Sequence, residues 1–209
     1  MICHGHGCYL QQSSLSPCAW VMRANHGDEY TIAEFNPIQW TFDNSPQILV
    51  PIANGSEEME AVMIIDILGR AKVNVVVVSV EDKLEILASR RIKLVADVLI
   101  DEAAKLSYDL IVLPKQKESN RPYGAICASP ALVLEPHGLL KGKKATAFPA
   151  MCNKLSDQSE IENRVVVDGN FITSRGPGTS MEFALAIVEK FFGRNKALEL
   201  AKIMLFTRA

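Results

Sequence analysis

The chain has 209 residues, 48% of them hydrophobic, which suits one compact domain with an appendage better than two full domains. Its 22 basic residues are balanced by 24 acidic ones without a dense basic cluster, so nucleic acid is not an expected partner. The longest apolar stretch, residues 73–80, is far shorter than the roughly 20 residues of a membrane span. Five irregularly spaced cysteines argue against a disulfide framework and favour a reducing compartment.

Residues 1–46 differ in composition from the rest and are expected to form an irregular N-terminal extension and linker, followed by a domain over residues 47–209. The stretch CHGHGC, from Cys3 to Cys8, contains good soft metal ligands. Its ligands are adjacent, however, and no second matching pair follows, so we expect no metal site. The extension also lacks the apolar core of a secretory signal.

From Gln47 onward, strand patterns alternate with helix patterns. Such alternation of apolar strands and helices predicts an α/β fold with a mostly parallel sheet covered on both faces. In chain order, we first expect a strand at 47–53 and a helix that is capped by Ser56 and extends to Ala71. Further strands are expected at 73–81, 93–100, 108–114, 123–127 and 143–148. Residues 164–174 are expected to form a hairpin with its turn at Asp168 and Gly169, and residues 180–193 a helix that ends at Gly193.

Only eight residues, 115–122, separate the strands at 108–114 and 123–127. A parallel crossover ordinarily takes a dozen or more residues. Eight extended residues reach about 26 Å and a five-residue strand is about 17 Å long, so the return can be spanned. It cannot also contain a helix.

Cys127 is the first candidate functional residue, because it ends an apolar strand and is followed by Ala128, Ser129 and a predicted helix, with Gly124 three residues before it. A strand, a sharp turn that carries the nucleophile and a helix form an elbow, which needs small neighbours. The following helix N-terminus is expected to favour the thiolate. A buried structural cysteine is the alternative interpretation.

Three acidic residues, Glu57, Glu58 and Glu60, open the helix after the first strand. One of them can point into the cleft at the carboxyl ends of the strands, where ligands of such sheets collect. Glu60 is offset from the solvated first turn and is the candidate, since a carboxyl buried beside a sulfur has a raised pKa and can hold a proton. Alternatively, all three complement the helix dipole. The stretch SRGPGTS, residues 174–180, predicts a helix entry capped by Thr179 or Ser180.

The segments GSEEMEA, YGAICASPALVLEPHGLLKGKKAT and ITSRGPGTSMEFALAIVEKFFG closely resemble the DJ-1/PfpI superfamily, the parkinsonism-associated deglycase group, over about residues 47–205. The resemblance is strongest to the second unit of plant-type tandem members, in which case residues 29–46 correspond to the inter-domain linker. It implies a flavodoxin-like three-layer sandwich with a mostly parallel sheet, a nucleophilic Cys127 at the elbow with Glu60 hydrogen-bonded to it, a homodimer and no cofactor.

The resemblance also implies roles for other positions. Arg90 matches an arginine near the oxidised cysteine and the dimer interface, and Ala128 and Gly124 belong to the cysteine environment. Phe148 stands where relatives often have a histidine, and His137 is expected to be structural. Relatives continue after Pro114 with a Gly-Gly turn and a whole helix, so this chain is expected to lack one crossover helix through an internal deletion.

Two functions follow from the resemblance. The first is a glutathione-independent glyoxalase or deglycase of the cytoplasm, or of the nucleus or a plastid, that uses Cys127 and Glu60 on methylglyoxal, another small α-oxoaldehyde or a glycation adduct in stress protection. The second is a non-catalytic redox sensor or interaction protein that uses Cys127, because the absent Gly-Gly turn supplies backbone N–H groups to the oxyanion site of relatives.

Overall fold

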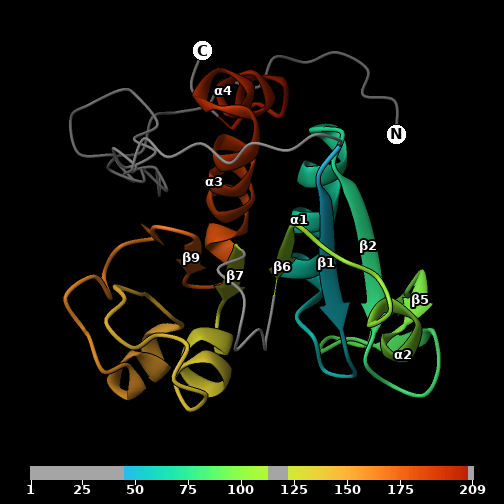
Figure 1. Cartoon of the computed structure of the whole chain (residues 1–209), viewed down its shortest axis with the longest axis horizontal. Coiled ribbons are helices and arrows are strands. Elements are labelled where there is room, and N and C mark those ends of the chain that lie inside the picture. The colour runs from blue at the N-terminus through green and yellow to red at the C-terminus, as the bar shows by residue number, and fades with distance from the viewer. Residues whose placement is uncertain (1–44, 113–121, 207–209) are drawn as a thin grey trace, which may run out of the picture.

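The computed structural model describes residues 45–112 and 122–206. The predicted N-terminal extension, the CHGHGC stretch and almost all of the short return at 115–122 lie outside these residues. Within them, seven strands form one sheet in the order β5-β2-β1-β6-β7-β9-β8, in which only β8 is antiparallel to its neighbour (Figure 1). This topology confirms the predicted α/β sandwich of flavodoxin type.

The elements follow one another along the chain in the predicted alternation. The strands of the main sheet are β1 (Gln47–Ile52), β2 (Asn74–Ser79), β5 (Val98–Leu99), β6 (Leu110–Val112), β7 (Tyr123–Ile126), β8 (Val165–Asp168) and β9 (Phe171–Ser174), and a separate ribbon holds β3 (Glu85–Leu87) and β4 (Lys93–Val95). The helices are α1 (Glu58–Arg70), α2 (Ile100–Ala103), α3 (Ser180–Phe192) and α4 (Arg194–Ile203), with the short helical segments η1 (Pro130–Leu134), η2 (Pro149–Lys154) and η3 (Pro177–Thr179).

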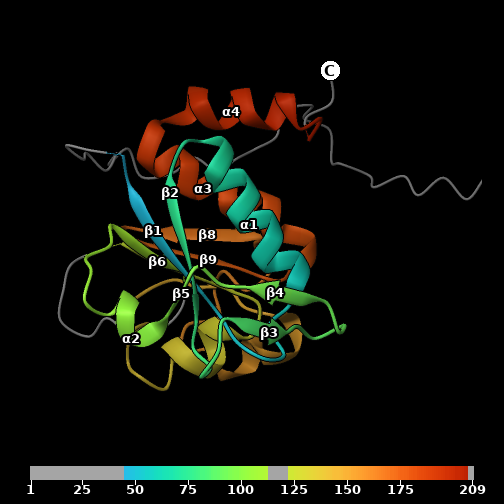
Figure 2. The same cartoon turned by 90° about the vertical axis from the view of Figure 1, so that its right-hand side faces the viewer.

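Alternation along β1 divides the core into two layers. Ile48 and Val50 are buried in the cluster that α1 and α3 cover, whereas Leu49 is buried on the other face with Ala103 of α2. Successive side chains of a strand point to opposite faces, so a strand that is apolar throughout must be covered on both. Figure 2 shows α1 and α3 on one side of the sheet and α2 on the other.

β6 and β7 are neighbouring parallel strands of the sheet, as predicted. Ile111 is paired with Tyr123 and Val112 with Gly124. Within the described residues, three helical segments cover the face of the sheet opposite α1 and α3. α2 packs near β1 and β2, whereas η1 and η2 pack near β7 and β9.

Two predicted strands differ from the structure for reasons of hydrogen bonding. Residues 93–100 are divided between β4, β5 and the start of α2, because the Asp97 carboxylate accepts the Val77 N–H at 2.8 Å and ends the ribbon. Residues 143–148 are not a strand: the Thr146 N–H donates to the Thr173 hydroxyl, at 3.0 Å, instead of to a carbonyl of a ladder. Side-chain acceptors of this kind compete with sheet pairing.

The predicted helix and turn boundaries agree better. The hairpin closes through Gly169, with φ 63°, and Gly193, with φ 81°, ends α3. Ser56 does not cap α1, however, because its hydroxyl accepts the Ala53 N–H at 2.9 Å and Glu57 occupies the cap position. The helix after Cys127 is a five-residue π-helical turn rather than a regular α-helix.

Candidate active site

Cys127 lies on a sharp turn immediately after β7. Its φ of 63° is in the left-handed region, which costs a non-glycine residue about 1–2 kcal/mol and which the surrounding structure must enforce. Two backbone hydrogen bonds do so: the Cys127 N–H donates to the Ser174 carbonyl at 3.0 Å, and the Phe148 N–H donates to the Cys127 carbonyl at 2.7 Å. The turn holds the thiol half-buried at the carboxyl end of the sheet.

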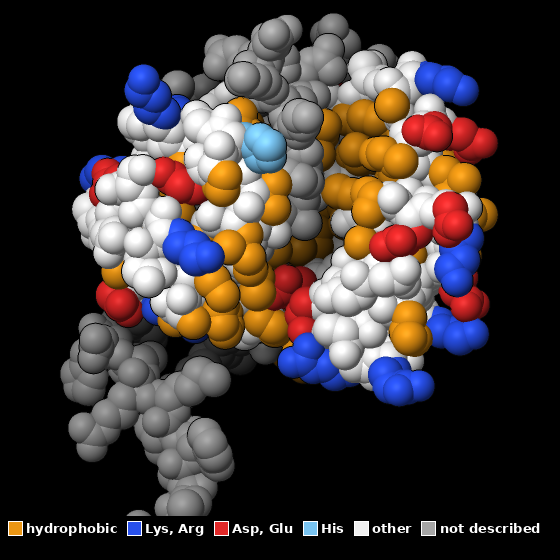
Figure 3. Space-filling view, turned by 90° about the horizontal axis from the view of Figure 1, so that it is seen from below, with side chains coloured by type: hydrophobic (Ala, Val, Ile, Leu, Met, Phe, Trp, Pro, Cys, Tyr) orange, Lys and Arg blue, Asp and Glu red, His pale blue; other side chains and the backbone are white. Residues whose placement is uncertain are grey.

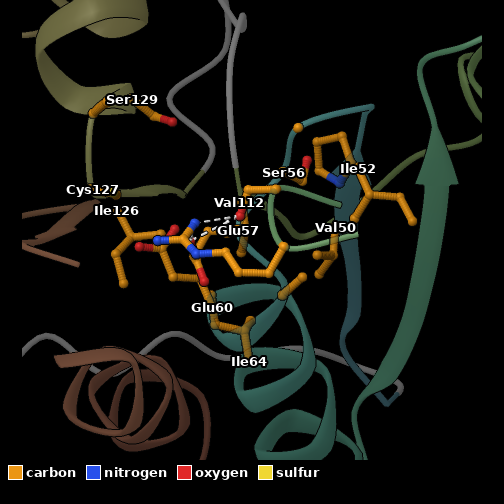
Figure 4. Close-up of a pocket in the computed structure, with 16 residues that line it drawn as sticks. Val50, Ile52, Ser56, Glu57, Glu60, Ile64, Val112, Ile126, Cys127 and Ser129 are labelled. Carbon is orange, nitrogen blue, oxygen red and sulfur yellow. Dashed lines mark hydrogen bonds and ion pairs between the residues drawn. The ribbon is translucent and has the colours of Figure 1, made fainter. Parts of the chain in front are cut away.

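Glu60, in the first turn of α1, and Cys127 line the same cavity of about 370 Å³. Figure 4 shows Glu60 reaching from α1 toward the elbow. Glu60 is only 8% exposed, and its Oε1 atom has no hydrogen-bond partner within the described residues. Viewed onto this end of the sheet, the surface is hollowed, with hydrophobic and acidic side chains along the hollow (Figure 3).

The other two acidic residues fasten a loop onto α1 instead of facing the thiol. Glu57 Oε2 forms an ion pair with Arg90 Nη1 at 2.6 Å, and Glu58 accepts the Arg90 N–H at 3.0 Å and the Ser89 hydroxyl at 2.9 Å. The Arg90 side chain is 69% exposed at the rim of the cavity. Among the three candidates, the fold therefore places Glu60 beside the cysteine.

Burial is the main influence on the Glu60 carboxyl and raises its pKa to about 7. The nearby Cys127 thiol lowers this pKa in part, and the negative charge of Glu57 raises it. A carboxyl with a pKa near neutrality can both give and take a proton under physiological conditions.

The prediction that Cys127 is activated by a helix N-terminus is wrong. Burial first, and then the charge and contact of Glu60, raise the pKa of the Cys127 thiol to about 12, whereas a hydrogen bond from the Ala128 backbone N–H lowers it only in part. The five-residue η1 offers little helix dipole. While Glu60 is ionised, the thiol keeps its proton.

We expect the stability of the protein to depend on pH through Glu60. Its folded-state pKa, about 7, lies above the ordinary 4.5, so the folded state binds the proton more tightly than the unfolded state. The stabilisation is therefore complete below pH 4.5 and is lost as the pH rises through 7. As the pH rises through this range, the free energy of unfolding measured with urea should fall by up to about 3 kcal/mol in the wild type because of Glu60. This fall should be absent in Glu60→Gln. Glu199→Gln, at an exposed position, should behave like the wild type, and equal pH slopes in all three proteins would contradict the prediction.

Gly124 does not belong to the cysteine environment, contrary to the prediction. It is buried in the middle of β7 and is absent from the lining of the cavity. A Cβ atom at this position would stand 3.0 Å from Cζ of Phe183 on α3, so the glycine allows α3 to pack closely against the sheet. Ala128, by contrast, lines the cavity next to the thiol.

Gly124→Ala should lower the free energy of unfolding by about 1–3 kcal/mol, because Phe183 must move to admit the methyl group. Gly69→Ala is the matched control: Gly69 lies in α1 with open space around a Cβ, so alanine should stabilise the protein by roughly 0.5–1 kcal/mol. Denaturant unfolding of both variants measures the difference. Equal effects of the same sign would contradict this account of Gly124.

Gly176 lies beside the site, and the sequence interpretation did not single it out. A Cβ atom here would be 3.8 Å from Glu60 Oε1 and 4.0 Å from Cys127 Sγ, so the glycine leaves the space beside both groups open. The Thr179 hydroxyl accepts the Gly176 N–H at 3.0 Å and holds this turn; it makes no side-chain cap to α3. The glycine and proline of the turn were the only signals in the sequence.

Two further expectations concern aromatic and metal-binding residues. Phe148 adjoins the elbow through its backbone and brings no titratable group to it, whereas His137 is exposed in the turn after η1.

In the part of the chain that the structure describes, no three His, Cys, Asp or Glu side chains are grouped as metal ligands. None of the described helices is long and apolar enough to cross a membrane.

A mostly parallel sheet between helices defines a flavodoxin-like sandwich, and at the carboxyl end of its sheet a cysteine on a left-handed turn lies in one cavity with a buried carboxyl. The model of the DJ-1/PfpI family matches residues 46–114 and 115–190. The chain belongs to this family. The two matched segments meet after Pro114, where the sequence interpretation places the deletion.

Individual relatives agree with this assignment. The chain is 68% identical to Protein DJ-1 homolog B of Arabidopsis thaliana, with 88% of this chain and 47% of that protein covered, and so spans about half the length of the plant relatives it matches. It is 28% identical to the Glutathione-independent glyoxalase DJR-1.2 of Caenorhabditis elegans, covering 76% and 94%. The oxidized DJ-1 of Toxoplasma gondii matches with a TM-score of 0.72 and 38% identity, covering 77% and 98%.

Proposed function

We propose that this chain acts as a glutathione-independent glyoxalase, or on the related early glycation adducts, with Cys127 as the nucleophile and Glu60 as the general acid and base. The observation that carries the proposal is the pair itself: a thiol on an enforced turn shares a cavity with a buried carboxyl whose Oε1 atom has no partner in the described residues. The glyoxalase name of the Caenorhabditis elegans relative supports it.

The reactive form of the pair has the proton on Glu60 and the negative charge on sulfur. With Glu60 neutral, its charge no longer opposes the thiolate, and the Ala128 N–H remains to stabilise it. The pKa of Glu60, about 7, keeps part of this carboxyl protonated at neutral pH. The neighbouring carboxylic acid thus takes the activating role that the sequence interpretation gave to the helix N-terminus.

The reaction needs no external oxidant. The sulfur attacks the aldehyde carbon of methylglyoxal, a C–S bond forms, and the carbonyl oxygen receives a proton to give a hemithioacetal. Glu60 then removes the proton from this carbon and returns a proton to the neighbouring carbon, so that one carbon is oxidised and the other reduced. Water cleaves the resulting thioester to lactate and releases the thiol.

The assay is lactate formation from methylglyoxal by the purified chain without glutathione. We expect turnover that is lost with the Cys127 thiol. Because the chain spans only about half of its plant relatives, the same assay on a full-length relative shows whether the activity requires the rest of the protein. Absence of lactate from this chain, in preparations that are folded by circular dichroism, would overturn the proposal.

The second candidate function is redox sensing through Cys127. The described residues bring no histidine to the elbow, where Phe148 stands, so Glu60 is the proton-transfer group beside the sulfur. The solved relative from Toxoplasma gondii is described as oxidized. Stoichiometric oxidation of Cys127 by peroxide, together with a failure to form lactate, would favour this function.

We further propose a homodimer in the cytoplasm. Exposed apolar side chains gather on the β3–β4 ribbon and the adjoining start of α1: Met59, Val62, Leu87, Ile92 and Val95. A patch of this kind is typical of a protein interface. The free thiols of Cys127 and Cys152 suit a reducing compartment. A sedimentation mass of a single chain would exclude the dimer.

A further inference from the structure

The hydroxyl of Thr179 is turned away from the helix that it precedes. Thr179 occupies the N-cap position of α3 but makes no side-chain cap to it. Instead its oxygen accepts the Arg175 N–H at 3.2 Å and the Gly176 N–H at 3.0 Å, and lies 2.6 Å from the Ser174 hydroxyl and 2.9 Å from the Gly176 carbonyl. These contacts use both lone pairs and the single proton of the hydroxyl. Thr179 is only 5% exposed, so it is committed to the segment before it.

The contact with Arg175 orients one peptide group that holds the nucleophile. The Ser174 carbonyl and the Arg175 N–H belong to the same planar peptide, so fixing one fixes the other. The N–H donates to Thr179, and the carbonyl accepts the Cys127 N–H at 3.0 Å. That bond is one of the two that enforce the left-handed turn of Cys127. Thr179 therefore acts on this turn through a single rigid group.

The contact with Gly176 acts on the other side of the reacting pair. A Cβ atom on Gly176 would be 3.8 Å from Glu60 Oε1 and 4.0 Å from Cys127 Sγ, so the backbone of this residue packs beside both groups. Thr179 holds it at both ends, because the Gly176 N–H donates to the threonine hydroxyl and the Gly176 carbonyl accepts the threonine N–H at 2.8 Å. A shift of this segment would change the surroundings of the thiol and the carboxyl together.

We propose that Thr179 is a positioning residue for the Cys127–Glu60 pair, whose hydroxyl holds the Ser174–Arg175 peptide and Gly176 against the two reacting groups. Thr179 does not line the cavity, so it acts through these residues and not on the substrate. The effect on turnover rests on the proposed function, whereas the effect on the thiol does not. The alternative is that the same hydrogen bonds only stabilise the fold.

The first test measures the thiol without any turnover. Thr179→Val keeps the shape of the side chain and leaves two backbone N–H groups without their acceptor, so residues 175 and 176 must move to find another. Burial is the first cause of the raised pKa of the Cys127 thiol, and loosening this segment exposes the sulfur. Alkylation of Cys127 by iodoacetamide near neutral pH, followed by peptide mass spectrometry, should become about tenfold faster. Thr179→Ser keeps the hydroxyl and should restore the wild-type rate.

The charged groups around the thiol are the same in these variants. Glu60 and Glu57 of α1 face it, and Arg90 at the rim pairs with Glu57. The Arg175 side chain is paired with Glu162 at 3.2 Å. A change in the pH dependence of alkylation therefore reports the position and burial of the sulfur, which a purely stabilising role of Thr179 would leave unchanged.

The second test measures turnover. In Thr179→Val, kcat for methylglyoxal should fall at least about tenfold with little change in KM, because a misplaced nucleophile slows the chemical step more than it weakens binding. Ser79→Ala is the matched control: its buried hydroxyl also holds a loop, through the Glu81 N–H at 3.2 Å and the Lys83 carbonyl at 2.6 Å, but it does not line the cavity. This control should lose stability and keep both rates.

Wild-type alkylation and kcat in a Thr179→Val protein that is folded by circular dichroism would overturn the inference, as would the same changes in Ser79→Ala. If Thr179→Val does not fold, Ser174→Ala removes one partner of the hydroxyl and keeps the carbonyl that binds Cys127. It should show the same changes to a smaller extent, and their absence would count equally against the inference. If the wild type converts no methylglyoxal, the proposed function fails, and the alkylation rates alone decide the role of Thr179.

Discussion

Cys127→Ser should reduce glyoxalase turnover by at least about 1000-fold, because the hydroxyl of serine is a far weaker nucleophile than a thiolate and Glu60 cannot ionise it to a comparable extent. The fold should be retained, since the turn at residue 127 depends on backbone bonds to Ser174 and Phe148 and not on the sulfur. Steady-state lactate formation measures the loss, and circular dichroism verifies folding.

Cys152→Ser is the matched control for that experiment. Cys152 is buried, and its thiol donates to the Ala147 carbonyl at 3.3 Å, a contact that a serine hydroxyl can reproduce. It does not line the cavity. This variant should retain wild-type turnover within a few-fold. Equal losses in the two variants would mean that the assay reports general damage to the fold, and full activity in Cys127→Ser would remove Cys127 from the mechanism.

Glu60→Gln should lower kcat by about 100-fold or more, because the amide cannot carry the proton between the two substrate carbons. The same change should lower the pKa of the Cys127 thiol below its value of about 12, because the carboxylate charge that opposes the thiolate is gone. The variant should therefore react faster with iodoacetamide near neutral pH while converting methylglyoxal more slowly. This combination distinguishes loss of proton transfer from loss of the nucleophile.

The pH dependence of alkylation, compared with lactate formation in the same samples, tests the prediction. Glu199→Gln on α4 is the control, because its exposed carboxylate pairs with Lys196 far along the chain from the elbow. It should change neither rate. Undiminished kcat in Glu60→Gln would show that another group transfers the proton, whatever happens to the thiol.

Much of the framework was predictable because it depends on short-range patterns. Apolar runs gave β1 and β7, glycine at residue 193 ended α3, and the small residues after Cys127 indicated the sharp turn, whose φ is 63°. The errors have a common cause. The side chains of Ser56, Asp97 and Thr173 accept hydrogen bonds from backbone N–H groups of the same loop or of segments distant in the sequence. Local propensity does not reveal such competition.

The candidate site was only partly predictable for the same reason. The sequence presents Glu57, Glu58 and Glu60 in one acidic run and favours Glu60 by its spacing. Only the structure shows that Arg90 and Ser89 of a later loop bind the other two. Gly176 is 49 positions beyond Cys127 in the sequence and still within contact range of its thiol. The resemblance named the pair of Cys127 and Glu60, but not the surroundings that set their charges.

By itself, the sequence determined the order of strands and helices, the family and the place of a cysteine at the end of β7, because periodicity, turn residues and motif spacing are properties of neighbouring residues. Only the tertiary structure decided that Gly124 serves packing, and that burial and the charge of Glu60 raise the pKa of the Cys127 thiol. The physical reason is that burial, pKa values and cavity shape arise from contacts between residues far apart in the chain.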